Sequence, residues 1–236
     1  MLWVPAGRSP LVTVSVIIPT LNEEAHLGET LRCARQAGAH EIIVVDGGST
    51  DRTRAVARPL AEVVLSATRG RATQMNAGAT RASGDILLFL HADTRLPADG
   101  VDAVRRACRS PAIVGGRFDV ELVPATPLLR LTGWLMNWRS RISRIATGDQ
   151  AIFVQREIFE RLGGYAEIPL MEDIELSRRL KRSGRVACLR QRVSTSARRW
   201  QTHGVVKTIL LMWTLRTLYW LGVAPVRLRR LYDDAR

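Results

Sequence analysis

Short apolar runs alternate with helix-patterned stretches over the first 110 residues. The runs are rich in β-branched and aliphatic residues, which is typical of strands covered on both faces. They predict strands at residues 11–18, 41–45, 62–65 and 85–90. The stretches between them predict helices at residues 23–36, directly after 51, at 71–82 and at 97–109. Asn22 is the expected N-cap of the first helix. This alternation predicts an α/β fold with a mostly parallel, doubly wound sheet.

The second half of the chain is less regular. It predicts strands at residues 114–122 and 151–154, and helices at 127–145 and 172–183. No internal repeat or low-complexity linker divides the sequence. We therefore expect one domain over residues 1–204, followed by a helical segment over 205–236 that is apolar at first and then basic.

The C-terminal segment has the composition of a surface-active helix. Residues 205–223 approach membrane-spanning length, but Lys207 and Arg216 interrupt them. Nine residues apart on a helix, these charges lie on opposite sides, and a charge near the centre of a span is costly. A helix packed on the domain and an interfacial helix both stay open, and the charges weigh against a span.

The balance of charge is basic. The chain has 35 Lys and Arg against 22 Asp and Glu, and residues 198–236 alone hold eight against two. Nucleic acid, anionic lipid and phosphorylated substrates all suit such a balance. The basic run at 227–230 favours an anionic membrane surface, with a solvated helix end as the alternative. Because the N-terminus shows no secretory signal, we expect a cytoplasmic protein that contacts the inner face of the membrane peripherally.

Polar residues follow the predicted strands, at the edge where open α/β sheets bind ligands. Asp46 begins the turn DGGSTD, and its carboxylate can accept hydrogen bonds from a nucleobase or ribose. The two glycines of that turn let the backbone approach a ligand closely. A turn or helix cap formed by Ser49 or Asp51 is the alternative.

Two further strand ends carry groups suited to phosphates and cations. Arg69 and Arg71 precede a helix, and their guanidinium groups together with the helix N–H groups predict an anion site, unless the loop is simply solvated. His91 and Asp93 follow the buried run DILLFL. A carboxylate there suits a hard divalent cation bound to a diphosphate.

The last candidates lie near the ends of the helical second half. Asp173 at the start of a helix is the candidate general base, although acidic residues are favoured there by the helix dipole in any case. Arg198, Arg199 and Trp200 can hold a diphosphate, and His203 can complete the coordination of a metal. A basic surface turn with a packed tryptophan is the alternative.

Seven motifs in one order resemble the family 2 inverting glycosyltransferases of the GT-A fold. They are SVIIPTLNEE, VVDGGSTDRT, GRATQMNAGA, ILLFLHADTRLP, GDQAIFV, MEDIEL and ARRW. The resemblance covers roughly residues 14–203. Within the family, the chain most resembles the short bacterial members called selenodomain-associated or radical-SAM-associated transferase 2.

The resemblance implies a GT-A fold with a Rossmann-like sheet, a nucleotide-sugar donor, a hydroxyl acceptor, and Mn²⁺ or Mg²⁺ as cofactor. The apolar C-terminal helix indicates an acceptor that is lipid-linked or otherwise near the membrane. With the residue patterns, the resemblance gives donor and nucleotide contacts at Pro19, Asn22, Glu23, Asp46, Arg69, Arg71, Ala92, Arg198, Arg199 and Trp200. It gives sugar and acceptor contacts at Gly148, Asp149, Gln150 and Glu172. It gives the catalytic base at Asp173 and metal ligands at Asp93 and His203, with His91 as a further candidate. Asp46, Asp93 and Asp173 are expected around a single cleft.

Two departures from the family and two rival functions stay open. The turn reads DGGS where the family commonly has DDGS, and the metal motif reads HAD where it commonly has DxD, so strict metal dependence is left open. A sugar nucleotidyltransferase would need a Gly-rich, Lys-bearing loop where this chain has PTLNEE. A non-enzymatic nucleic-acid or membrane binder would need no acidic motifs at strand ends, and we expect no nucleic-acid partner.

Overall fold

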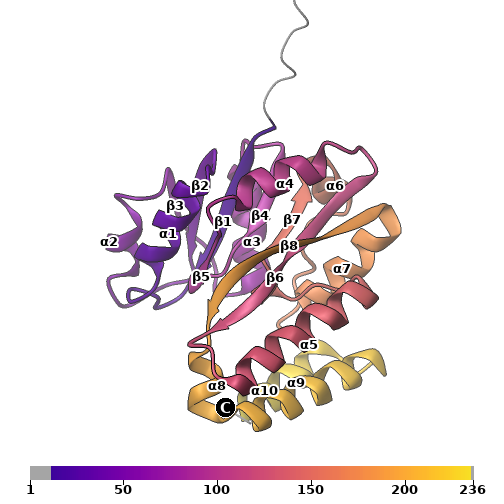
Figure 1. Ribbon diagram of the computed structural model, residues 1–236. Helices are drawn as coiled ribbons and strands as arrows, with labels where there is room; N and C mark the ends of the chain where they lie inside the picture. Colours follow the sequence, from indigo (N-terminus) through magenta and orange to yellow (C-terminus); the bar gives the residue numbers. More distant parts are fainter. Residues whose placement is uncertain (1–11, 235–236) are drawn as a thin grey trace, which may run out of the picture.

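A mixed eight-stranded sheet forms the centre of the protein (Figure 1). The computed structural model describes residues 12–234, apart from the side chains of Arg199, His203 and Asp234. The strands are β1 (Val14–Thr20), β2 (Glu41–Asp46), β3 (Val63–Ser66), β4 (Ile86–Phe89), β5 (Thr94–Arg95), β6 (Ile113–Val123), β7 (Ile152–Gln155) and β8 (Arg185–Ser196). Their order across the sheet is β3-β2-β1-β4-β7-β6-β8-β5.

The parallel half of the sheet confirms the four strands expected in the first 110 residues. β3, β2, β1 and β4 pair in parallel. Val16, Ile18 and Val44 belong to the core on one face, and Ile17 and Val45 belong to the core on the other. Burial on both faces explains why these strands are continuous apolar runs in the sequence.

The other half of the sheet is mixed. β7 pairs antiparallel with both β4 and β6, β8 runs parallel to β6, and β5 pairs antiparallel with β8. β8 was not among the predicted strands. Its residues alternate between buried, half-buried and exposed, and several of them are arginine, so they lack the apolar run of a covered strand.

Helices cover both faces of the sheet. They are α1 (Leu27–Gln36), α2 (Thr53–Ala57), α3 (Arg71–Arg81), α4 (Gly100–Cys108), α5 (Pro127–Ser143), α6 (Arg156–Arg161), α7 (Glu172–Ser183), α8 (Arg198–His203), α9 (Val205–Trp220) and α10 (Pro225–Asp234), with a 3₁₀ turn η1 (Gly148–Gln150) before β7. α1 and α4 contribute to one core cluster, and α3, α6 and α7 contribute to the cluster on the opposite face. The layered α/β architecture expected from the sequence is therefore confirmed.

The loop after β1 differs from its prediction. α1 begins at Leu27, and Asn22 is not its N-cap. Asn22 instead adopts a positive φ of 54° and joins the loop after β1 to the loop after β2. Its backbone N–H donates to Ser49 Oγ at 2.9 Å, and its side-chain oxygen accepts from the Thr50 N–H at 2.9 Å. The amide thus fixes the loop after β1 against the loop after β2.

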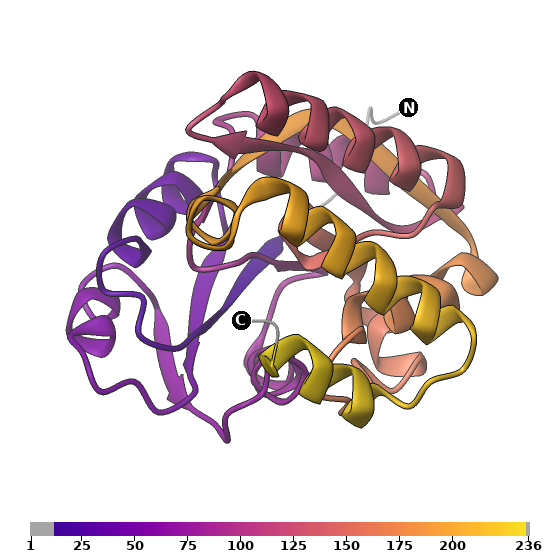
Figure 2. The same cartoon turned by 90° about the horizontal axis from the view of Figure 1, so that it is seen from below.

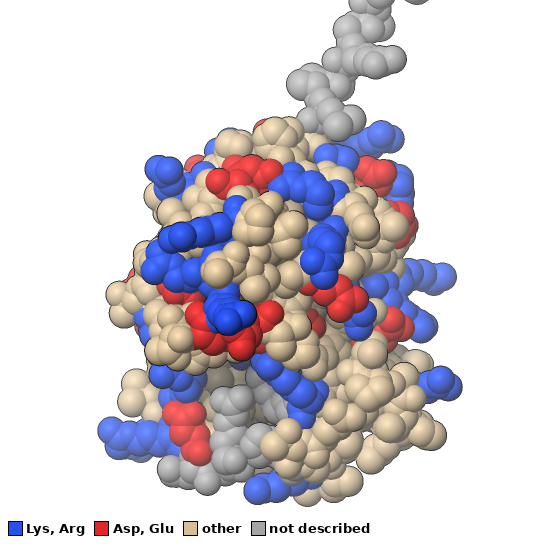
Figure 3. All heavy atoms as spheres, turned by 90° about the vertical axis from the view of Figure 1, so that its left-hand side faces the viewer, with Lys and Arg blue, Asp and Glu red and all other residues tan. Residues whose placement is uncertain are grey.

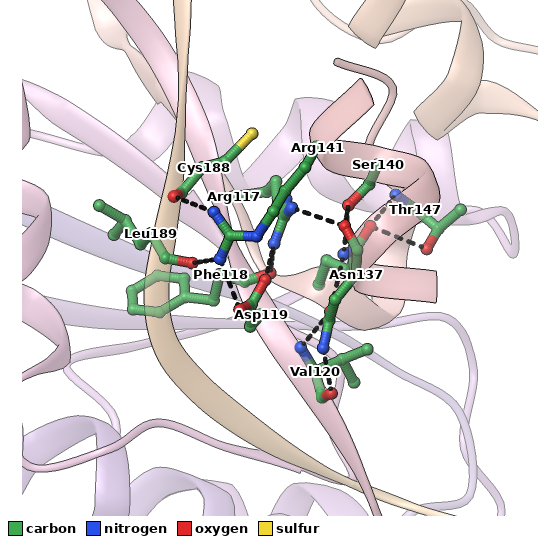
Figure 4. A network of polar contacts seen from close by, with 11 residues as sticks. Arg117, Phe118, Asp119, Val120, Asn137, Ser140, Arg141, Thr147, Cys188 and Leu189 are labelled. Atoms are coloured by element: carbon green, nitrogen blue, oxygen red, sulfur yellow. Dashed lines mark hydrogen bonds and ion pairs between the residues drawn. The ribbon is translucent and has the colours of Figure 1, made fainter. Parts of the chain in front are cut away.

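A buried polar network attaches α5 to β6 (Figure 4). Asp119 on β6 pairs with Arg117 and with Arg141 of α5. The Asn137 side chain accepts from the Val120 N–H at 2.8 Å and donates to the Val120 carbonyl at 2.9 Å. Because an amide that satisfies both backbone groups of one strand residue fixes distance and register together, α5 has one defined position on the sheet.

The C-terminal helices pack on the rest of the protein with one face only. Leu215, Leu228 and Tyr232 form a cluster with Leu170 and Ile174. The opposite face of α9 is exposed, with Trp213 62% accessible. Across residues 12–234, none of the helices is both long enough and apolar enough to cross a bilayer. The division of the chain at residue 204 stays a prediction.

Candidate active site

A cleft of about 420 Å³ opens where β1 and β4 end, as expected for an open α/β sheet. Loops, the start of α3, the end of β8 and α8 complete its walls. Ten residues predicted from the sequence line it, namely Pro19, Glu23, Arg69, Arg71, His91, Ala92, Asp93, Asp149, Arg198 and Trp200. Segments from five different parts of the chain thus meet at one surface.

One side of the cleft holds two carboxylates and a guanidinium. Arg198 forms a close ion pair with Glu23, and its Nη2 lies 3.8 Å from Asp93 Oδ2. Glu23 Oε2 is buried and has no hydrogen-bond partner among the described residues. Burial raises the pKa of Glu23, and the charge of Arg198 opposes that rise. An unsatisfied acceptor in a ligand cleft suits a donor from the ligand, such as a ribose hydroxyl.

The other side joins the cleft to Asp173. His91 Nδ1 lies 3.3 Å from Asp149 Oδ1. Gly148 packs directly on the His91 ring, since a Cβ at this position would lie 2.8 Å from Cε1 and still closer to Nε2. The Gly148 N–H donates to Asp173 Oδ2 at 2.8 Å. His91 in the cleft wall therefore contacts Gly148, and Gly148 in turn contacts Asp173 at the start of α7.

Glu172 lies beside this path in a separate environment. Its side chain is 6% exposed and lies 3.8 Å from Arg71 Nη1. Burial raises the pKa of Glu172, the neighbouring charge of Asp173 raises it further, and Arg71 opposes both. Glu172 lines an adjoining cavity of about 380 Å³, to which Arg69 and Arg71 also contribute. Both hollows are lined by Arg69, Gly70, Arg71 and Arg229.

Asp46 does not line the cleft. Its residue is 1% exposed, and its carboxylate accepts from the N–H groups of Gly48 and Ser49 and from the Ser49 hydroxyl. Gln74 lines the cleft in its place and donates to the carbonyls of Thr20 and Val45 at 2.9 and 2.8 Å. Of the three carboxylates expected around one cleft, only Asp93 lines it, Asp173 is linked to it through Gly148, and Asp46 fixes the turn after β2.

The remaining predicted residues have varied positions. Gln150 is fully buried and donates to Ser140 Oγ at 2.9 Å, so it supports α5 rather than facing the cleft. Asn22 joins the two loops described above. The side chains of Arg199 and His203 lie outside the described part of the structure. The binding roles of all these residues stay predictions.

Sequence reasoning missed several residues of this region. Gln74, Thr195 and Arg229 line the cleft, and none was singled out beforehand. Arg229 belongs to α10, whose basic run gave no sign that one arginine faces the cleft. Thr195 belongs to β8, which was not predicted.

The residues present fit a divalent cation that is coordinated partly by protein side chains and partly by the phosphates of a substrate. Within the described residues, no three His, Cys, Asp or Glu side chains form a metal cluster. Asp93 lies in the cleft with its carboxylate toward Arg198, and His91 and Asp149 lie on the other side. Mg²⁺ and similar ions are commonly held by one or two carboxylates plus substrate phosphates, which matches this arrangement.

Known proteins resemble the chain in sequence and in fold. Residues 15–159 match the model of "Glycosyl transferase family 2". The chain is 32% identical over 151 residues to an undecaprenyl-phosphate 4-deoxy-4-formamido-L-arabinose transferase of Pseudomonas paraeruginosa, across 58% of this chain and 42% of that protein. It is 33% identical over 164 residues to a PGL/p-HBAD biosynthesis glycosyltransferase of Mycobacterium bovis, across 64% and 62%. The match therefore spans less than two thirds of either relative.

The fold comparison extends over nearly the whole chain. A mannosyltransferase from Pyrobaculum calidifontis, solved with GDP-Man and Mn²⁺, superposes with a TM-score of 0.66 and 22% identity. The superposition covers 95% of this chain and 69% of the other. At this identity the likeness concerns the fold, and it confirms the GT-A architecture expected from the motifs.

Proposed function

Because the chain belongs to glycosyltransferase family 2, we propose that it transfers a sugar from a nucleotide-diphosphate sugar to an acceptor hydroxyl, with inversion at the anomeric carbon. One observation carries the proposal. The cleft gathers Glu23, Asp93 and Arg198 from three distant segments, and Gly148 links His91 in the cleft wall to Asp173. Sugar transfer needs cationic groups for the diphosphate and a base for the acceptor hydroxyl. Arginines in the cleft supply the first, and Asp173 beside the cleft wall is the candidate for the second.

The donor would lie along the Glu23 side of the cleft. Glu23 Oε2 is available to a ribose hydroxyl, and Arg198 with Arg69 and Arg71 supplies guanidinium groups for the diphosphate. Asp93 would hold Mn²⁺ or Mg²⁺, with His91 and His203 as further candidates. The ion, when bound, neutralises charge on the departing nucleoside diphosphate.

The chemical step assigned to this chain is a single displacement. Asp173 takes the proton of the acceptor hydroxyl, and the oxygen forms a bond to the anomeric carbon as the bond to the diphosphate breaks. Arg198 stabilises the charge that collects on the diphosphate. The N–H groups of Gly148 and Ile174 donate to the two Asp173 oxygens at 2.8 and 2.7 Å, which fixes the orientation of the base.

The acceptor proposed here is lipid-linked, and the protein would reach it as a peripheral protein at a membrane surface. The curated relative from Pseudomonas paraeruginosa is named for an undecaprenyl-phosphate substrate. The exposed apolar faces of α5 and α9 support the same class. The motifs resemble those of the selenodomain-associated or radical-SAM-associated group, and membership of that group is part of the proposal.

The base assignment is tested with Asp173→Asn. The amide keeps the size of the carboxylate and can still accept the Gly148 N–H, but it cannot take a proton. We expect turnover to fall about 10²–10⁴-fold while donor affinity stays within about twofold. Glu157→Gln, on the exposed surface of α6, is the control and should keep wild-type turnover.

Release of the nucleoside diphosphate is the readout. A wild-type rate for Asp173→Asn would show that another group is the base. Pyrophosphate as product, in place of a nucleoside diphosphate, would favour the nucleotidyltransferase alternative. Charge-driven nucleic-acid binding lacks support on the face shown in Figure 3, where acidic side chains interleave with the basic ones.

A further inference from the structure

Arg139 and Arg216, outside the donor cleft, have buried donors without a partner among the described residues, as does Nε of Arg117, whose other nitrogens are paired. Arg139 lies on α5 and Arg216 on α9. Nε and Nη2 of Arg139 and Nε of Arg216 are buried and lack a hydrogen-bond partner among the side chains and backbone that the structure describes. A buried donor left unpaired costs stability, and more so when it carries charge. Such a pair is expected where a ligand supplies the acceptors.

Nearby acidic groups are engaged elsewhere. Asp119, the acid buried against α5, already pairs with Arg117 and Arg141. Asp173 accepts from two backbone N–H groups. The contrast with Arg141 is direct, because that guanidinium lies two residues from Arg139 on the same helix and is paired to a carboxylate at 2.6 Å.

The charges of the two guanidinium groups act on each other. Burial, together with the positive charge of Arg216, lowers the pKa of Arg139 to about 10, and Asp173 opposes this shift. Burial likewise lowers the pKa of Arg216, opposed by Asp173 and Asp149. Two partly buried like charges that both respond to the charge of Asp173 make a local positive field near the candidate base.

An apolar surface adjoins the arginine pair. α5 and α9 run alongside each other in both ribbon views (Figures 1 and 2). Large apolar side chains are exposed on both helices, namely Leu128, Leu131, Trp134, Leu135, Trp138 and Ile142 on α5 and Val206, Leu210, Trp213 and Trp220 on α9. The spacing of 3.6 residues per turn puts Arg139 and Arg216 on the flanks between these exposed stripes and the buried faces of their helices. A patch of this kind marks an interaction site.

We propose that Arg139 and Arg216 bind the phosphate group of an amphiphilic acceptor, whose hydrocarbon part lies against the exposed stripes of α5 and α9. The inference rests on the proposed sugar transfer and names the chemistry of its acceptor. A phosphate monoester carries nearly two negative charges and three acceptor oxygens, which matches two guanidinium groups with free donors. Tryptophans beside a polar group suit the boundary between a lipid chain and its headgroup.

The test is calorimetric titration of the full chain with decyl phosphate below its micelle concentration. Arg139→Gln/Arg216→Gln should weaken binding by about tenfold or more, because each arginine supplies charge-assisted hydrogen bonds. Arg130→Gln/Lys207→Gln is the matched control, since it removes the same charge from exposed positions of the same two helices. The control should stay within about twofold of wild type. Equal affinity in all three proteins would overturn the proposal.

Two further probes separate the phosphate from the chain. Inorganic phosphate should bind more weakly than decyl phosphate, and decyl maltoside should show no dependence on the two arginines. If inorganic phosphate binds as tightly as decyl phosphate, the hydrocarbon chain does not contribute and the ligand is not an amphiphile. If decyl maltoside binds the arginine variant more weakly than the wild type, the two arginines do not act by binding the phosphate group.

Folding and donor binding are measured on the same variants. Arg139→Gln/Arg216→Gln should unfold at or above the wild-type temperature, because it removes unpaired buried charge. A marked fall would mean that the arginines hold the fold, against the proposal. Titration with nucleoside diphosphates reports the donor cleft separately. If no nucleoside diphosphate binds the wild type, the proposed function is wrong. If decyl phosphate binds Arg139→Gln/Arg216→Gln as tightly as the wild type, only the proposed phosphate site at these two arginines is wrong.

Discussion

Asp119→Asn removes the charge that two arginines share in the network between β6 and α5. Arg117 is 1% exposed and Arg141 is 34% exposed, so only the first is fully withdrawn from water. The amide keeps the shape of the side chain and removes its charge. The substitution therefore leaves the Arg117 guanidinium buried without a counter-charge, while Arg141 can turn toward solvent.

The size of the loss follows from these exposures. A hydrogen bond to a charged group contributes about 1.5–3 kcal/mol, and the Arg141 bond counts at the low end because solvent screens it. Loss of one partner of a buried pair costs about 3–5 kcal/mol in all. For a chain of this size, that corresponds to a fall in Tm of about 6–20 °C.

Urea unfolding followed by circular dichroism measures this free energy of unfolding. Glu157→Gln is the control, because its pair with Arg161 is exposed on both sides and should cost under about 1 kcal/mol. A loss of under about 1 kcal/mol for Asp119→Asn would refute the reasoning. It would show that α5 does not depend on this network for its position.

Two further substitutions test the region between the cleft and α7. Gly148→Ala should lower turnover at least tenfold with little change in nucleotide affinity, because its Cβ would displace the His91 ring and shift the N–H that orients Asp173; wild-type turnover in an enzyme assay would contradict this. Glu172 has a raised pKa in the folded protein. Its contribution to the free energy of unfolding is therefore fully present at pH values below its pKa in the unfolded chain, and it is lost as the pH rises through its pKa in the folded protein. Glu172→Gln should therefore exceed the wild type in free energy of unfolding at pH 7.5, and the gain should vanish near about pH 4. A gain that persists at pH 4 would show that burial of the charge is not its cause.

The parts of the fold that were predictable share one property. β1, β2 and β4 are buried on both faces, so each is a continuous apolar run that the sequence displays directly. β8 was missed because nine of its twelve positions are exposed or half-buried and arginines occupy several of them. α10 was read as a basic tail because few of its side chains are buried, among them Leu228 and Tyr232.

The site divides in the same way. Glu23 and Arg198 were found because they belong to the motifs SVIIPTLNEE and ARRW, and Asp93 was found because it follows the buried strand β4. Asp46 occupies such a position too, yet the N–H groups of its own turn take up its carboxylate. The site proposed at Arg139 and Arg216 depends on how α5 and α9 lie beside each other. The sequence of neither helix alone predicts such a site.

The central claim is that the cleft at Asp93 holds a nucleoside diphosphate together with a divalent cation. Its most direct test is calorimetric titration of UDP, GDP, CDP, ADP and dTDP with and without Mn²⁺, on the wild type and on Asp93→Asn. We expect that at least one of them binds, that Mn²⁺ strengthens its binding, and that Asp93→Asn removes the Mn²⁺-dependent part of the affinity. Failure of every nucleotide to bind, or identical Mn²⁺-dependent binding in both proteins, would contradict it.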